Sequence, residues 1–318
     1  MAEHTVMHEN LCVTVVPQGS IVSIIQIKQK GDRTMAYFGP SGNEDAFYEA
    51  GYKSSTQMPE YVAKLGLDAY EYQCSRGVKI TEKTANVLGC EAKKYNVKLS
   101  IHAPYYINLA TDDEQKRINS IKYITDSMVA AKFMGADRVV VHSGACAKMP
   151  RETAMEYAFK TLKMAYDEAK NLGVESVHIC PETMGKINQL GDLEEVLRLC
   201  AINDSFLPTI DFGHLNARTF GGLKTKQDFE HIFDRIENVL GHDRLDCFHA
   251  HFSRIEFTEK GGEKKHHKLS DIEYGPDFDF IAEILVKRDL HPTIICESDG
   301  NMAQDALILK NMYNQARG

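Results

Sequence analysis

The chain has 318 residues, which is enough to bury a full hydrophobic core as one large domain or two small ones. Its content of 43% hydrophobic and 26% charged residues is ordinary for a soluble globular protein, and no apolar run approaches the roughly 20 residues of a membrane span. The net charge of −8 argues against a strongly basic coat for nucleic acid, although it allows a local basic surface. With no signal-like N-terminus, we expect a cytoplasmic monomer without membrane contact.

The first 34 residues do not share the pattern of the rest of the chain. Two apolar stretches, 11–16 and 21–28, flank the tetrapeptide PQGS, an arrangement that suggests a β-hairpin with a tight turn. Met35 is an alternative start of the chain, since the repeating pattern begins directly after it. We therefore interpret 1–34 as an N-terminal extension without assigned chemistry and 35–318 as the catalytic domain.

From Met35 onward, short apolar runs alternate with longer amphipathic stretches. The runs have the length of strands and lie at 36–39, 69–72, 98–102, 138–142, 176–182, 207–211, 246–251 and 293–297. Between them, apolar residues recur at helical spacing, at 120–135, 153–173, 192–202, 228–241, 278–288 and 303–315. Eight β-then-α units in about 280 residues predict an α/β fold of the (β/α)₈ TIM-barrel class. The alternative is an open doubly wound sheet, but the sequence has no GxGxxG phosphate loop after an early strand.

Six polar residues lie at or just past the ends of these runs. They are His102, His142, Glu182, Asp211, His251 and Glu297. A single histidine at such a place is more often a hydrogen-bonded core residue, but an unpaired polar group there costs free energy, so six in succession indicate one shared site. In a TIM barrel the active site forms at the C-terminal ends of the strands. Three imidazoles and three carboxylates are a ligand set for zinc or a similar divalent ion.

Further histidines lie close to these positions. Asp211 and His214 belong to the motif DFGH, whose short spacing lets both side chains reach the same side of a strand-to-loop turn. His249 and His251 share one face of their strand, and we prefer His251 as the ligand because it is nearer the strand end.

A lysine-rich segment at 261–271 follows the seventh strand and contains His266 and His267. We expect a loop that overhangs the barrel mouth, where it could add a ligand and meet an anionic substrate. The eight cysteines are scattered without a CxxC pair, and we interpret them as buried thiols.

The order of seven motifs carries a resemblance to a known family. LSIHAPYYINLA, VVVHSGA, PETMGKINQLGDLEEV, TIDFGH, HAHFS, KKHHKL and ICESD resemble the endonuclease IV family of apurinic/apyrimidinic endonucleases, over about residues 36–315. That family consists of TIM-barrel DNA-repair phosphodiesterases with a trinuclear zinc site. The resemblance implies hydrolysis of the DNA phosphodiester 5′ to an abasic site in base excision repair.

The resemblance also implies roles for the candidate residues. One zinc would be held by His102, His142 and Glu182, a second by Glu182, Asp211, His251 and Glu297, and a third by His214 and His266. Glu182 would bridge two ions, and Glu297 would also orient the attacking hydroxide that clustered metal ions generate near neutral pH.

The third zinc site departs from the family pattern. The family completes it with an aspartate two residues before the last histidine, and here that position is Lys264, with Glu263 directly before it. A protonated lysine cannot bind a metal. The third site is therefore weak, absent, completed by Glu263, or replaced by the charge of Lys264 on a phosphate.

The resemblance extends to DNA recognition at fewer positions. Tyr105 stands where the family has a tyrosine that enters the duplex, and its alternative role is that of a packing aromatic. Arg76, after the second predicted strand, could also penetrate the duplex. Arg218 and Lys224 could meet phosphates, as could Lys264.

Two other functions stay open. A sugar isomerase or epimerase on the same barrel would use one or two divalent ions such as Mn²⁺, with Glu182 or Glu297 moving a proton on a small sugar substrate. A non-catalytic metal-binding barrel ranks last, because simple metal binding does not require so many strand ends.

Overall fold

The computed structural model describes residues 7–8, 11–12 and 35–318, and the chain divides into two compact units, Met1–Arg33 and Thr34–Gly318. In the first unit, β1 (Met7–His8) pairs with β2 (Leu11–Cys12) in an antiparallel sheet. The hairpin predicted around PQGS lies outside the described residues. The second unit contains all of the candidate site residues.

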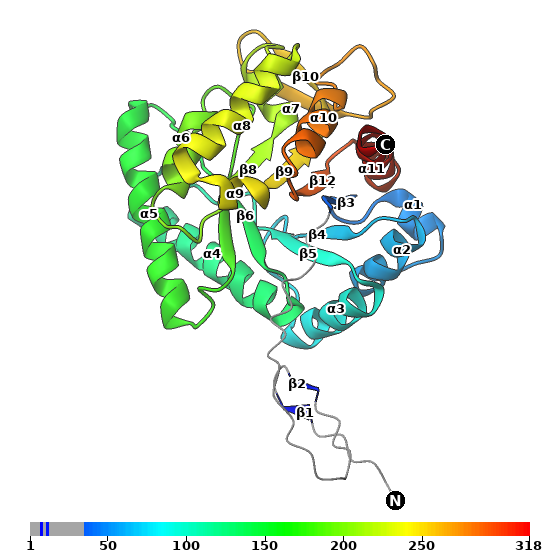
Figure 1. The fold of residues 1–318 in the computed structure, drawn as a ribbon. Helices are drawn as coiled ribbons and strands as arrows, with labels where there is room; N and C mark the ends of the chain where they lie inside the picture. Colours follow the sequence, from blue (N-terminus) through cyan, green and yellow to red (C-terminus); the bar gives the residue numbers. More distant parts are fainter. Residues whose placement is uncertain (1–6, 9–10, 13–34) are drawn as a thin grey trace, which may run out of the picture. The chain divides into compact units, whose positions relative to one another are not determined.

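Eight parallel strands of the second unit form a barrel (Figure 1). They are β3 (Tyr37–Pro40), β4 (Ala69–Gln73), β5 (Lys98–His102), β6 (Arg138–His142), β7 (His178–Glu182), β8 (Thr209–Asp211), β9 (His249–Phe252) and β12 (Thr293–Cys296). Hydrogen bonding runs in the order β3-β12-β9-β8-β7-β6-β5-β4. The predicted (β/α)₈ fold is confirmed.

The first and last strands of this order meet and close the barrel. A parallel bridge joins Ser41 to Glu71, and the Gly42 amide donates to the Glu71 carbonyl over 2.9 Å. A Cβ atom at Gly39 would lie 1.8 Å from the Ala69 carbonyl oxygen, so this close approach of β3 to β4 requires glycine.

Helices surround the barrel (Figure 1). They are α1 (Asp45–Glu49), the short 3₁₀ helix η1 (Ser55–Gln57), α2 (Met58–Lys64), α3 (Glu82–Tyr95), α4 (Glu114–Met134), α5 (Arg151–Asn171), α6 (Leu193–Cys200), α7 (Phe212–Arg218), α8 (Lys226–Leu240), α9 (His242–Asp246), α10 (Asp279–Lys287) and α11 (Met302–Arg317). Helix α4 ends before Gly135, whose positive φ of 69° suits the left-handed cap expected from the sequence. In residues 35–318 no helix is both long and apolar enough to cross a membrane.

Successive side chains along a barrel strand point to opposite faces, which separates core residues from site residues. In β9, for example, Ala250 and Phe252 belong to the main hydrophobic core, while His249 and His251 join the polar side chains of the site. One face of each such strand thus carries functional groups, and the other face packs in the main hydrophobic core.

One prediction about local structure was wrong. The segment 261–271 is not a simple loop, because β10 (Arg254–Thr258) and β11 (Gly262–His267) form an antiparallel hairpin. The hairpin is tied to the segment after β7, since Glu263 N donates to Gly185 O over 3.1 Å and Ile187 N donates to Gly261 O over 3.2 Å. These long-range bonds are not visible in the local sequence pattern, which is rich in lysine and poor in apolar residues.

Candidate metal centre

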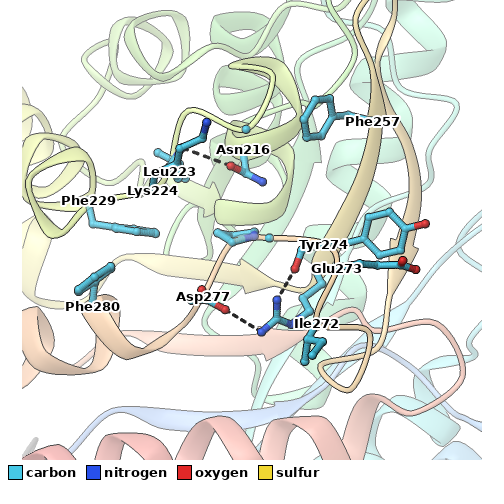
Figure 2. Close-up of a pocket in the computed structure, with 14 residues that line it drawn as sticks. Asn216, Leu223, Lys224, Phe229, Phe257, Ile272, Glu273, Tyr274, Asp277 and Phe280 are labelled. Atoms are coloured by element: carbon cyan, nitrogen blue, oxygen red, sulfur yellow. Dashed lines mark hydrogen bonds and ion pairs between the residues drawn. The ribbon is translucent and has the colours of Figure 1, made fainter.

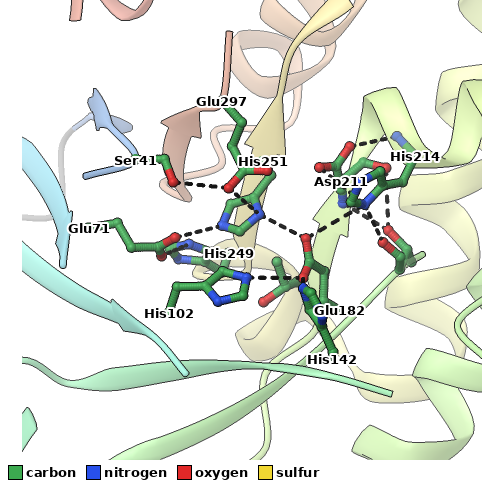
Figure 3. A network of polar contacts seen from close by, with 12 residues as sticks. Ser41, Glu71, His102, His142, Glu182, Asp211, His214, His249, His251 and Glu297 are labelled. Atoms are coloured by element: carbon green, nitrogen blue, oxygen red, sulfur yellow. Dashed lines mark hydrogen bonds and ion pairs between the residues drawn. The ribbon is translucent and has the colours of Figure 1, made fainter. Parts of the chain in front are cut away.

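The ends of the barrel strands and the segments that follow them bring the predicted metal ligands together in three groups. Figure 3 shows the first two of these groups. The groups are His102, His142 and Glu182; Glu182, Asp211, His251 and Glu297; and His214, Glu263 and His266. Within each group the ligand atoms lie within 4.8 Å of one another. All eight residues predicted as ligands are therefore found in these groups, and Glu182 belongs to two of them.

Glu182 lies between the histidines and is almost fully buried, with 1% of its surface exposed. Its Oε2 atom is 3.4 Å from His102 Nε2 and 3.2 Å from His142 Nε2, and its Oε1 atom is 2.9 Å from His251 Nδ1. Oε2 has no hydrogen-bond partner, and neither has the buried Oδ2 atom of Asp211. Buried carboxylate oxygens without partners cost free energy, so these atoms fit a cation held between them and the imidazoles.

Hydrogen bonds on the opposite ring nitrogen orient three of the imidazoles, and in two of them a backbone carbonyl also fixes the proton on that nitrogen. Nδ1 of His102 lies 2.8 Å from the Ala103 carbonyl, and Nδ1 of His214 lies 2.9 Å from the Thr183 carbonyl. Nδ1 of His266 lies 2.8 Å from Ser253 Oγ. A proton on Nδ1 leaves the Nε2 lone pair available to a metal.

The DFGH motif lies where β8 ends and α7 begins, and this junction positions Asp211 and His214. Asp211 ends β8 and caps α7, since its Oδ1 atom accepts from the His214 amide over 2.6 Å. This bond turns Oδ2 toward the centre and places His214 one helical turn further along. A Cβ atom at Gly213 would lie 2.9 Å from the Ser253 carbonyl, so glycine lets the new helix pack against the end of β9.

In the metal-free protein, neighbouring groups of opposite charge shift the pKa values of the site residues. Burial opposes the ionised form of Glu182, but contacts with three histidines outweigh it and hold the pKa of that carboxyl well below its usual value. Burial likewise lowers the pKa of His102 and His214, yet the neighbouring carboxylates outweigh it and raise the pKa of each to about 9. The pKa of Asp211 is raised, chiefly by burial. The centre is built to hold positive charge.

The third group uses Glu263, the residue that the sequence left as one of four possibilities. In the hairpin, Ile255 pairs with His266, Glu256 with Lys265 and Phe257 with Glu263, so Lys264 is the extra residue of a β-bulge.

The bulge changes which side chains share a face of the hairpin. Residues three apart normally lie on opposite faces of a strand, but one extra residue places Glu263 and His266 on the same face. Glu263 Oε2 lies 3.5 Å from His214 Nε2, whereas Lys264 is turned to Glu256, with Nζ 2.5 Å from Oε1. The loop after β7 has glycine at position 185, where Glu263 comes close. A Cβ atom at Gly185 would lie only 2.6 Å from Glu263 Cβ, so the absence of a side chain there makes room for Glu263.

Sequence reasoning missed Glu71 and treated His249 as an alternative to His251. Glu71 is fully buried at the centre of β4, and its carboxylate lies 3.0 Å from His249 Nε2 and 3.1 Å from His251 Nε2. Burial lowers the pKa of His249 to about 4, so this ring is neutral. The signal was a single acidic residue inside the otherwise apolar run AYEY at 69–72.

A cavity of about 270 Å³ opens onto the centre and includes Tyr105 among its lining residues. Tyr105 is 45% exposed, and Arg76 Nε donates to its hydroxyl over 3.1 Å, so two residues predicted to bind DNA lie together at the rim.

Arg218 has a different position. Its guanidinium donates to the carbonyls of Met184, Lys186 and Gln189 and thus holds the loop after β7. A contact of Arg218 with phosphates stays a prediction.

Lys224 lines a different pocket, of about 320 Å³, beside the hairpin (Figure 2). Phe229, Phe280 and Ile272 contribute its apolar walls, and Tyr274 contributes a polar edge. No residue lines both this pocket and the cavity at the metal centre. Lys224 is thus placed away from the candidate ligands.

Comparison with known proteins agrees with the TIM-barrel fold. A family model described as xylose isomerase-like TIM barrel matches residues 59–312. An uncharacterized protein of Methanocaldococcus jannaschii is 33% identical over 80% of this chain and 90% of its own length. A probable endonuclease 4 of Acholeplasma laidlawii is 25% identical over 53% of this chain, and the match spans 56% of that relative.

Two solved structures have a similar fold. Endonuclease IV from Thermus thermophilus aligns with a TM-score of 0.63 at 18% identity, covering 88% of this chain and 97% of that one. A D-tagatose 3-epimerase-like protein aligns with a TM-score of 0.66 at 21% identity, covering 88% and 96%. At these identities the likeness concerns the barrel alone, and one fold supports several chemistries.

Proposed function

The chain belongs to the xylose isomerase-like TIM barrel family, and from this premise we propose that it is a metal-dependent phosphodiesterase that cleaves DNA 5′ to abasic sites. The observation that carries the proposal is the size of the ligand set. One ion needs only Glu182, Asp211, His251 and Glu297, yet two further histidine groups adjoin this set. Several neighbouring ions suit phosphodiester hydrolysis, whereas polarising one sugar carbonyl needs fewer.

Zinc is the ion that this donor set favours. Imidazole and carboxylate ligands are its usual partners, although the same donors also accept Mn²⁺. We assign His102, His142 and Glu182 to one ion, and Glu182, Asp211, His251 and Glu297 to a second. When bound, such ions supply a hydroxide near neutral pH and neutralise the phosphate.

The protein groups around this chemistry have separate tasks. Glu182 joins two ligand groups through one carboxylate, so it sets the distance between them. Glu297 accepts a hydrogen bond from Ser41 Oγ over 3.0 Å, which fixes its carboxylate beside the substrate cavity, where it can orient the attacking water. Tyr105 and Arg76 stand at the rim, where a displaced nucleotide would enter.

The direct test is incision of a duplex that carries one abasic site by the zinc-replete full chain. Cleavage 5′ to the lesion, absent from the undamaged duplex and removed by a chelator, is expected. An active, metal-loaded protein that epimerises ketoses and leaves the abasic duplex intact would support the alternative function. One observation favours that alternative: a cavity of about 270 Å³ is of a size for a small sugar.

The third ion gives a prediction about metal content. Glu263→Gln is expected to bind one zinc fewer per chain than the unaltered protein, because the amide is a poor ligand and His214 and His266 alone leave the site incomplete. Lys264→Ala is the matched control and is expected to retain all the zinc, since Lys264 faces Glu256. Inductively coupled plasma mass spectrometry on dialysed protein measures both. Equal metal content in Glu263→Gln, or a loss in Lys264→Ala, contradicts the assignment.

The exposed tyrosine gives a prediction about DNA affinity. Tyr105→Ala is expected to weaken binding to the abasic duplex by about 1–3 kcal/mol, the range for one stacked base. Tyr105→Phe keeps the ring but loses the hydrogen bond from Arg76, so it is expected to bind nearly as well as the unaltered protein. Fluorescence anisotropy at fixed salt separates the two. If both variants bind alike, the ring does not stack on DNA.

A further inference from the structure

A polar layer adjoins the proposed ligands, and the proposed reaction does not use it directly (Figure 3). Its centre is Glu71, whose Oε1 atom is 3.1 Å from His251 Nε2 and accepts from the Gln73 amide over 3.2 Å. The other oxygen, Oε2, is 3.0 Å from His249 Nε2 and accepts from the Ser100 hydroxyl over 2.9 Å. Glu71, His249 and His251 have no exposed surface.

The two nitrogens of His251 face different surroundings. Nδ1 lies 2.9 Å from Glu182 Oε1 and 3.6 Å from Glu297 Oε1, within the four-residue ligand group. Nε2 faces away from that group, toward Glu71. A neutral imidazole has one lone pair, so Nδ1 can bind a cation only if the ring proton sits on Nε2.

We propose that Glu71 is a positioning residue, whose carboxylate keeps the proton on Nε2 of His251 and so presents the Nδ1 lone pair to the metal. This inference rests on the proposed function, because it takes His251 as a ligand. The contact from Nε2 is close but is not aligned as a hydrogen bond. A carboxylate at 3.1 Å nevertheless favours the ring form with its N–H on that side, since the buried charge attracts the proton. A carboxylate behind a histidine ligand also makes the ligand more basic.

The same layer holds Glu71 itself in place. Gln73 donates to Glu71 and also to Ser41 Oγ, over 2.6 Å, and Ser41 donates to the proposed ligand Glu297. Glu71 is therefore connected to the centre on two sides, through His251 and through this chain of side chains. A neutral residue at position 71 would leave the Nε2 side of both buried imidazoles without an anion, so the layer depends on the charge of Glu71.

A different occupant of the layer is the rival explanation. The ligand atoms of Glu71, His249 and His251 also lie within 4.8 Å of one another, which is close enough for a buried ion. Such an ion would take the lone pair of His251 at Nε2 and leave Nδ1 protonated. Because a neutral ring cannot serve both sides, the position of the His251 proton decides between the two.

The first measurement uses the unaltered, zinc-loaded full chain with ¹⁵N-labelled histidine. Long-range ¹H–¹⁵N correlation spectra report which nitrogen of His251 carries the proton, with His251→Gln identifying the signal. A proton on Nε2 and metal on Nδ1 are expected. Metal on Nε2, or a further zinc that is lost in His249→Ala, overturns the proposal. This result does not depend on whether a variant of Glu71 folds.

The second measurement compares zinc affinity by competition with a chelator. Glu71→Gln keeps the size of the side chain, removes its charge, and is expected to weaken zinc binding at the centre by about 10- to 100-fold. Ser100→Ala removes another partner of Glu71 without touching His251 and is expected to bind zinc normally. Unchanged affinity in Glu71→Gln overturns the proposal. Because both measurements follow metal binding, a protein that binds zinc as described but does not incise DNA contradicts the proposed function and leaves this inference standing.

Discussion

Glu182→Ala is expected to reduce incision of an abasic duplex by on the order of 10³-fold or more, because the several kcal/mol of transition-state stabilisation from clustered ions depends on the carboxylate they share. Glu182 contacts His102, His142 and His251, and its removal leaves these imidazoles to repel one another when they are protonated. The same variant should lose zinc from two groups at once. Incision kinetics under single-turnover conditions, together with metal content, measure both effects.

The control for this variant is Glu175→Ala, which removes an exposed glutamate outside the ligand groups. It should cleave the abasic duplex at the rate of the unaltered protein. Incision by Glu182→Ala at the control rate would remove the basis for the phosphodiesterase proposal. If Glu182→Ala instead loses only a ketose epimerase activity, the barrel serves the alternative chemistry.

The sequence predicts most of the barrel because its apolar runs are distinct and end in polar residues. The structure places His102, Glu182 and Asp211 at the ends of three such runs, and the barrel brings them together. These positions follow from local pattern and fold class alone. Their roles as ligands remain predictions that the metal analyses test.

The remaining parts of the site depend on contacts that a local pattern does not contain. Glu263 reaches His214 only because the bulge at Lys264 changes the face of the strand, and a bulge depends on pairing with β10. In the sequence, Glu71 is a single charged residue in a short apolar strand. In the folded barrel, His249 and His251 lie against its carboxylate. In both cases the partner lies far away in the sequence.

The metal-free protein is expected to lose stability as the pH rises from about 6.5 to about 9. His102 and His214 have pKa values of about 9 in the folded chain, against 6.5 for the unperturbed group. Because the folded pKa is the higher one, their contribution is complete below pH 6.5 and disappears as the pH rises through 9. A shift of this size corresponds to about 3 kcal/mol for each histidine. The sum is smaller than twice this value, since both rings face Glu182.

Bound zinc should reverse this dependence of stability on pH, because it replaces the protons on the imidazole nitrogens of His102 and His214. Zinc uptake is then expected to release protons and to become tighter between pH 6.5 and 8.5. Urea unfolding in chelator and in excess zinc, repeated across this range, measures the two trends in one protein. Buried cysteines such as Cys74, whose pKa burial raises to about 12, also destabilise the fold at high pH, but they act equally in both forms. The difference between the curves therefore reports the centre, and a metal-free stability that stays level or increases from pH 6.5 to 8.5 contradicts the charge pattern described for His102 and His214.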